Sequence, residues 1–171
     1  FDQDLGAYFD ADLKAGRLDE AAATALLSEL WANFDANDGW HLLLGGTDTV
    51  SRRFTRLCVT TMAPFRRPNA GIRVEDGMPD DLWEAIFDGW QAGGVNPALY
   101  NEAAYATGIA SLPGIPPELR HQFACGGCTE LMVHGKSNVG SLEGDLNLPL
   151  VLVDSLHQRL AACPNFDDFL S

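Results

Sequence analysis

The first third of the chain carries two apolar stripes with the spacing of helices. Gly16 lies between the two stripes, as a glycine at the end of a helix does, and Asp19 precedes the second stripe, where its side chain can cap a helix. The two stripes together predict a helical hairpin over residues 1–39. They consist of Leu5, Tyr8, Phe9 and Leu13, followed by Ala22, Leu26, Leu27, Leu30, Trp31 and Phe34.

The rest of the chain alternates short apolar runs with longer amphipathic segments. Strands are expected at 40–44, 70–74, 97–101 and 122–125. Helices are expected at 49–63, 78–92, 102–109 and 146–160, with a short one at 117–121. Residues 126–145 are rich in glycine and polar residues and are expected to form a loop. Such alternation is typical of parallel strands joined by helical crossovers, so we expect an α/β fold.

Composition and charge limit the classes of function that the chain can have. The 171 residues correspond to about one domain. The net charge of −13, from 11 basic and 24 acidic residues, disfavours binding to nucleic acids or to anionic membrane surfaces. We find no apolar stretch of ~18 residues and no basic leader, and four cysteines are too few for a disulfide scaffold, so we expect a cytoplasmic protein. Because the chain starts at Phe1 and its last residues resemble the opening of a helix, we expect a segment truncated at both ends.

The segment 124–131 carries the candidate chemistry. Cys125 and Cys128 form one Cys-x-x-Cys pair, but a structural zinc site needs four nitrogen or sulfur ligands and no second pair is present, so no metal site is expected. A redox pair would open a helix, whereas these cysteines lead into the expected loop. Cys125 by itself is interpreted as a buried strand residue. Cys128 follows two glycines and precedes Glu130 by two residues, which places a thiol nucleophile or radical carrier beside a general base.

Several motifs in order resemble one enzyme family. The segment Gly127-Cys128-Thr129-Glu130 resembles the cysteine loop of the glycyl radical enzymes, the pyruvate formate-lyase-like family. The resemblance extends over nearly the whole chain. Its other parts are His134-Gly135-Lys136-Ser137, the run Leu146–Leu152, Leu44-Gly45-Gly46-Thr47-Asp48, Pro68 with Ile72-Arg73-Val74 and Pro79, Pro97–Glu102, and the N-terminal hairpin.

The resemblance implies a fold and a mechanism. The family fold is a ten-stranded β/α barrel with the cysteine on an inner loop. We therefore expect a helix-rich partial β/α barrel, in which residues 40–171 form part of the barrel and 124–131 the cysteine loop. By the same resemblance Cys128 carries the thiyl radical and Glu130 accepts a proton. Gly127, where the pyruvate formate-lyase branch has a second cysteine, favours the branch with a Gly-Cys-x-Glu loop, and the resemblance implies a glycyl radical lyase or dehydratase.

The implied partners lie outside the chain. The family's glycyl radical is installed by a radical S-adenosylmethionine activating enzyme, and no Arg-Val-x-Gly-Tyr-like motif for it occurs here. We expect the isolated chain to bind no cofactor and to be inactive. Its expected partners are the rest of the enzyme with the glycyl loop, the activating enzyme, a small-molecule substrate and further copies of itself. The alternatives are a stand-alone non-catalytic binding module and a small Cys-x-x-Cys metal or redox protein.

Other polar residues receive weaker assignments. Arg73 lies in an expected strand and should pair with a carboxylate, because a buried unpaired guanidinium is too costly. Arg73, Asn101 and His134 are retained as candidates for substrate binding. His41, next to an apolar run, is interpreted as a core histidine with satisfied hydrogen bonds. Asp48 is expected either to cap a turn or to contact the barrel or a substrate.

Overall fold

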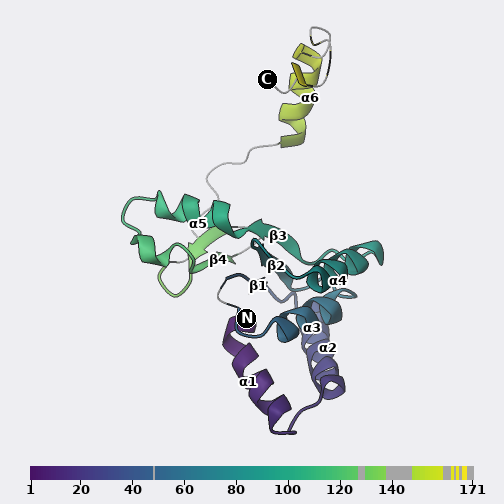
Figure 1. Cartoon of the computed structure of the whole chain (residues 1–171). Coiled ribbons are helices and arrows are strands. Elements are labelled where there is room, and N and C mark those ends of the chain that lie inside the picture. Colours follow the sequence, from purple (N-terminus) through teal and green to yellow (C-terminus); the bar gives the residue numbers. More distant parts are fainter. Residues whose placement is uncertain are drawn as a thin grey trace. The chain divides into compact units, whose positions relative to one another are not determined.

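The computed structural model describes residues 1–47, 49–126, 130–137 and 148–159, together with 163, 165, 167 and 168. The chain forms two compact units, residues 1–139 and 140–171. The second unit contains α6 (Leu148–Arg159) at the position of the expected last helix. The first unit contains, in order, α1 (Asp2–Lys14), α2 (Glu20–Ala36), β1 (His41–Gly45), α3 (Arg52–Met62), β2 (Asn69–Val74), α4 (Asp80–Gln91), β3 (Ala98–Asn101), α5 (Glu102–Ala110), a 3₁₀ turn (Pro117–Leu119), β4 (Phe123–Gly126) and β5 (Glu130–Val133) (Figure 1).

The expected helical hairpin is confirmed as α1 and α2. Gly16 adopts a φ of +67° directly after the end of α1, a conformation that glycine adopts without steric cost. Asp19 caps α2, and its Oδ1 accepts a hydrogen bond of 2.7 Å from the Ala22 N–H. The sequence signals for both helix ends therefore correspond to the observed contacts.

A small parallel sheet confirms the α/β class. Its strand order is β1-β2-β3, with α3 and α4 as the crossovers between neighbouring strands. One face of the sheet packs in the larger core with residues from α1 to α4, and it contributes Leu42, Leu44, Ala70 and Ile72. Figure 1 shows α2, α3 and α4 to one side of the sheet and α5 with β4 to the other.

The opposite face of the sheet belongs to a second cluster. Leu43 and Tyr100 from the sheet pack there with Phe123, Cys125 and Val133 from β4 and β5. The register places Leu43 beside Gly71, and a Cβ at residue 71 would lie 2.2 Å from Cε2 of Tyr100. Glycine at this position therefore leaves the space that the Tyr100 ring occupies.

The expectation of an uninterrupted loop after Gly126 was wrong for residues 130–133. These residues form β5, which pairs antiparallel with β4 and brings Gly126 opposite Glu130. The apolar run Leu131-Met132-Val133 is too short for a recognisable strand period. Its strand character comes from the backbone partner that β4 supplies.

The part of the chain that the structure describes contains no helix both long and apolar enough to cross a membrane.

Candidate functional site

A buried ion pair lies at the carboxyl ends of the parallel strands, where α/β proteins commonly place their sites. The Arg73 Nε of β2 lies 3.9 Å from Oε2 of Glu102, the first residue of α5, and their side chains are 2% and 3% exposed. The guanidinium also donates from Nε and Nη2 to the Gly45 carbonyl at 3.0 and 2.7 Å, and from Nη1 to the His121 carbonyl at 2.9 Å. The expectation that Arg73 pairs with a carboxylate is therefore confirmed.

The Glu102 carboxylate joins three segments. Its Oε2 accepts from the Thr47 N–H at 3.2 Å, and its Oε1 accepts from the Thr47 hydroxyl at 2.9 Å. Its Oε1 also lies 3.3 Å from Nδ1 of His121. One carboxylate thus ties the turn after β1 to Arg73 of β2 and to the segment before β4.

Two glycines, the last residue of β1 and the residue after it, make room for the guanidinium. Gly45 and Gly46 have φ values of +70° and +103°, which side chains rarely allow. A Cβ on Gly46 would lie 2.4 Å from the Arg73 guanidinium. The Gly-Gly-Thr part of the sequence motif and Arg73 are therefore parts of one arrangement.

A cavity of about 600 Å³ opens beside this ion pair. It lies within the first unit, where the β4–β5 hairpin faces β1, β2 and the start of α1. A volume of this size is typical of sites for small molecules. The lining consists of Phe1, Gln3, Asp4, His41, Leu42, Leu43, Arg73, His121, Gln122, Phe123, Ala124, Cys125, Met132 and His134.

His41 lines this cavity, and its interpretation as a satisfied core histidine was wrong. Both ring nitrogens are buried, and neither has a hydrogen-bond partner among the described residues. Burial lowers the pKa of His41 from its ordinary value of 6.5, whereas the charge of Glu130 acts in the opposite direction. Burial therefore prevails, and the imidazole is neutral at pH 7. The sequence carries no signal for this site, because a single histidine in an apolar run has no spacing to read.

The structure confirms the interpretation of Cys125 as a buried strand residue. It lies in β4 and is 6% exposed. Burial raises the pKa of the Cys125 thiol, and Glu130 raises it further, while a hydrogen bond with the Tyr100 side chain acts in the opposite direction. Cys125 is therefore a protonated thiol at neutral pH and a poor nucleophile.

The structure describes only one of the two residues that are expected to carry the chemistry, Cys128 and Glu130. Cys128 lies outside the described residues, as does Asp48. Glu130 is described: it opens β5 opposite Gly126, and its charge acts on both His41 and Cys125. Residues 127–129 connect two strands whose side chains line the cavity.

The three candidates for substrate binding occupy different places. Arg73 and His134 line the cavity, whereas Asn101 is absent from the lining residues that the structure describes. Asn101 instead caps α5, where its Oδ1 accepts a hydrogen bond of 2.9 Å from the Ala104 N–H. An asparagine just before a helix is itself a capping signal. The place of His121 beside Glu102 was not predicted from the sequence.

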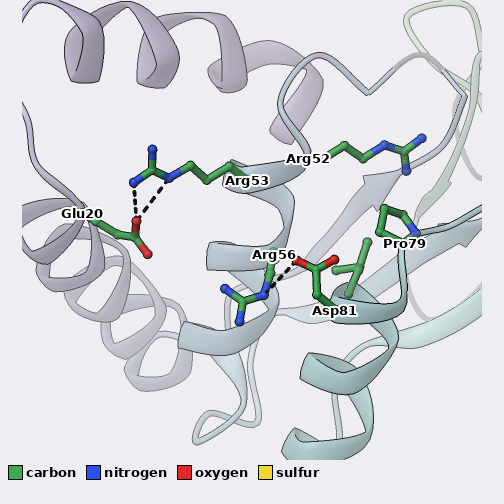
Figure 2. A pocket seen from close by; sticks show the side chains of 7 residues that line it. Glu20, Arg52, Arg53, Arg56, Pro79 and Asp81 are labelled. Carbon is green, nitrogen blue, oxygen red and sulfur yellow. Dashed lines mark hydrogen bonds and ion pairs between the residues drawn. The ribbon is translucent and has the colours of Figure 1, made fainter.

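A second, smaller cavity lies among arginines of α3. Its volume is about 270 Å³. Figure 2 shows Arg53 turned toward Glu20 and Arg56 toward Asp81. The Arg53 Nη2 lies 2.5 Å from Glu20 Oε2, and the Arg56 Nε lies 3.4 Å from Asp81 Oδ2. These four side chains are largely exposed, so their charges are compensated in solvent-screened pairs. The larger cavity is therefore the better candidate site.

Within the described ranges, no three histidine, cysteine, aspartate or glutamate side chains are grouped so that they could hold a metal ion. A search of curated proteins and a search of solved structures each found no significant match. A family model described as pyruvate formate lyase-like matches residues 44–160, well over half of the chain and the whole of the Arg73–Glu102 arrangement. The chain therefore belongs to the pyruvate formate lyase-like family.

Proposed function

We propose that the chain is the cysteine-loop region of a glycyl radical lyase of the dehydratase type, with Cys128 as the thiyl residue and Glu130 as the proton acceptor. One observation carries the proposal: Gly126 and Glu130 pair across the β4–β5 hairpin, beside a cavity lined by Arg73 and His41. Cys128 is two residues from each member of that pair along the chain. Family membership supports the same assignment.

The reaction divides between two side chains of this region. A glycyl radical on another segment of the enzyme would supply the oxidation by taking a hydrogen atom from the Cys128 thiol. The Cys128 thiyl then takes a hydrogen atom from a substrate carbon. Glu130 takes the proton of the adjacent hydroxyl, and the leaving group departs with its bonding electrons. The product radical recovers a hydrogen atom from the Cys128 thiol, which restores the thiyl.

The surroundings of the cavity suit such chemistry. Thiyl and substrate radicals must be kept from water and oxygen, and the sulfur must be held near one C–H bond. Gly126 and Glu130, which flank residues 127–129 in sequence, pair with each other across the β4–β5 hairpin. The family barrel is built from parallel strands around the cysteine loop. The parallel β1-β2-β3 sheet, with the β4–β5 hairpin packed on one face, fits a part of such a barrel. We place the glycyl loop and the remaining strands on other parts of the enzyme, which acts in the cytoplasm under anaerobic conditions.

Electron paramagnetic resonance with matched cysteine variants tests the proposal. The full gene product that carries this chain is treated anaerobically with a radical S-adenosylmethionine activating enzyme. It is then offered small diols, amino alcohols and 2-oxo acids, with NMR detection of products. Cys128→Ala should retain the glycyl radical signal but lose turnover, because the thiol that passes the hydrogen atom is gone. Cys125→Ala, the matched control, should retain both. The chain Phe1–Ser171 alone should give neither signal nor turnover. Turnover by Cys128→Ala, or a gene product that never forms the radical, would contradict the proposal.

The same variants test the alternatives. A Cys-x-x-Cys metal or redox protein needs both thiols, so Cys125→Ala and Cys128→Ala would then lose bound metal or disulfide exchange equally. A non-catalytic binding module would form no radical with any activating enzyme. The burial of Cys125 and its raised pKa favour the radical enzyme, because a redox pair is expected to contain a thiolate.

A further inference from the structure

Three aromatic side chains form a continuous stripe along α4. Trp83, Phe87 and Trp90 recur at the spacing of one helix face. The Phe87 ring stacks on Trp83 with ring centroids 5.8 Å apart, and it meets Trp90 edge-on at 5.6 Å. Trp83 and Trp90 are half-buried against the larger core, whereas Phe87 is 48% exposed. Phe87 therefore presents the middle of an aromatic stripe to solvent, and such side chains are enriched in protein interfaces.

The neighbouring helix α3 does not cover this stripe. The Arg56 Nε of α3 lies 3.4 Å from Oδ2 of Asp81. A Cβ on Gly89 would lie 3.2 Å from Cβ of Ala63, at the end of α3. These two contacts place α3 along the flank of α4 that carries Asp81 and Gly89. At 3.6 residues per turn, Phe87 lies on the opposite flank.

Carboxylates follow the stripe along the outer side of α4. Asp80, Glu84 and Asp88 are exposed, recur every four residues, and form no ion pair with any residue that the structure describes. Asp80 lies in the first turn, where a negative charge stabilises the helix dipole, but this explanation does not extend to Glu84 and Asp88. Like charges four residues apart destabilise a helix, and α4 contains no basic residue that could offset them. A cationic partner would relieve this repulsion.

The chemistry of this surface selects its partner. Carboxylates attract arginine and lysine side chains by charge, and tryptophan and phenylalanine rings attract them by cation–π contact. A helix with arginine or lysine at every fourth position would match the spacing of the three carboxylates on α4. A second copy of this chain is disfavoured as the partner, because it carries a net charge of −13.

We infer that α4 is the docking surface for a basic helix of another protein. That helix covers Phe87 with apolar side chains and pairs its arginine or lysine side chains with Glu84 and Asp88. Among the described residues that line the large cavity, none belongs to α4. Docking therefore requires no radical chemistry, and the inference goes beyond the proposed function.

Isothermal titration calorimetry with helical peptides tests the inference on the chain Phe1–Ser171. A peptide of leucine and arginine should bind, and the same peptide with glutamate in place of each arginine should not. Phe87→Ala should weaken binding of the arginine peptide at least tenfold, and so should Glu84→Gln combined with Asp88→Asn. Added salt should weaken binding to the parent more than binding to the double variant, because salt screens exposed charges.

Matched variants at other exposed positions provide the controls. Tyr8→Ala removes an exposed ring of α1, and Glu29→Gln combined with Glu118→Gln removes two exposed carboxylates. Both should bind the arginine peptide within twofold of the parent. Circular dichroism shows whether each variant is folded, and Phe87→Gln, which also removes the ring, gives a second reading should Phe87→Ala fail to fold. Failure of the arginine peptide to bind, equal binding by the variants without the ring, or equal binding of the glutamate peptide would overturn the inference.

Hydroxyl radical footprinting of the full gene product shows whether the partner is a separate protein. Phe87 should be oxidised in the free gene product and protected by the arginine peptide, whereas oxidation of Tyr8 should not change when the peptide is added. Protection of Phe87 without the peptide would mean that the rest of the same enzyme covers α4, and it would overturn the inference. The cysteine test of the proposed function can succeed or fail independently, because it follows radical formation and turnover.

Discussion

Arg73 and Glu102 form a buried pair in which the guanidinium Nε lies 3.9 Å from the carboxylate Oε2. The two residues come from β2 and from the start of α5, and no solvent screens them at 2% and 3% exposure. The pair lies where the turn after β1 and the segment before β4 also meet, through Thr47 and His121. It therefore fixes the relative positions of the segments that surround the cavity.

Removing the charge of Glu102 should destabilise the fold. Glu102→Gln removes the carboxylate charge that is buried beside Arg73, and the loss of one partner of a buried pair costs about 3–5 kcal/mol. Urea denaturation measures the change in the free energy of unfolding. Glu29→Gln is the matched control, because Glu29 is exposed on α2, and it should stay within about 0.5 kcal/mol of the parent. Equal stability of the two variants would show that the pair contributes little.

The space that Gly46 leaves for Arg73 can be tested separately from its backbone conformation. Gly46→Ala adds a Cβ 2.4 Å from the guanidinium at a φ of +103°, whereas Gly77→Ala adds one at a φ of +78° with nothing within 4 Å. Both variants incur the strain of positive φ, about 1–2 kcal/mol. Only Gly46→Ala should also displace Arg73, so its loss of stability should be the larger. Thermal unfolding of both variants provides the comparison, and a similar loss in both would exclude a steric role for residue 46.

Gly71 offers the same kind of test on the face of the sheet that packs against β4 and β5. A Cβ there would lie 2.2 Å from the Tyr100 ring, so Gly71→Ala should cost about 1–3 kcal/mol by overpacking. Gly108→Ala, inside α5 with open space around it, should instead stabilise the protein by about 0.5–1 kcal/mol. Urea denaturation should therefore give shifts of opposite sign. Stabilisation by Gly71→Ala would mean that the ring moves aside at no cost.

Much of the first unit could be predicted from local sequence. Gly16 and Asp19 indicate the end of α1 and the start of α2 by short-range chemistry, and the apolar residues of β1 and β2 lie between turn and loop residues that mark them as strands. The sequence alone was enough to single out the Leu44–Asp48 motif, which contains Gly46, and to single out Arg73 as a candidate site residue. Their contact could not, because it depends on how strands distant in sequence align.

The errors concern long-range pairing and isolated residues. Leu131–Val133 becomes a strand only because β4 lies beside it, and the preceding glycines suggest a loop. His41 and His121 have no partner at a characteristic spacing, so their places beside the cavity and Glu102 follow only from the fold. The role of Asn101 in substrate binding stays a prediction, and the helix cap that it forms before α5 was not predicted.

The lowered pKa of His41 should appear in the pH dependence of stability. Well above pH 6.5 the histidine is neutral in both states, so its contribution is constant there. As the pH falls through 6.5 the unfolded chain takes up a proton that the folded state resists, and the folded state loses stability relative to the unfolded chain. His41→Asn removes this titration, so the stability of the parent relative to the variant should decline as the pH falls from about 8 to about 5. Urea denaturation across this range measures the decline. A parent that instead gains stability over His41→Asn at low pH would mean that the charge of Glu130 prevails over burial and that the imidazole in the cavity is protonated.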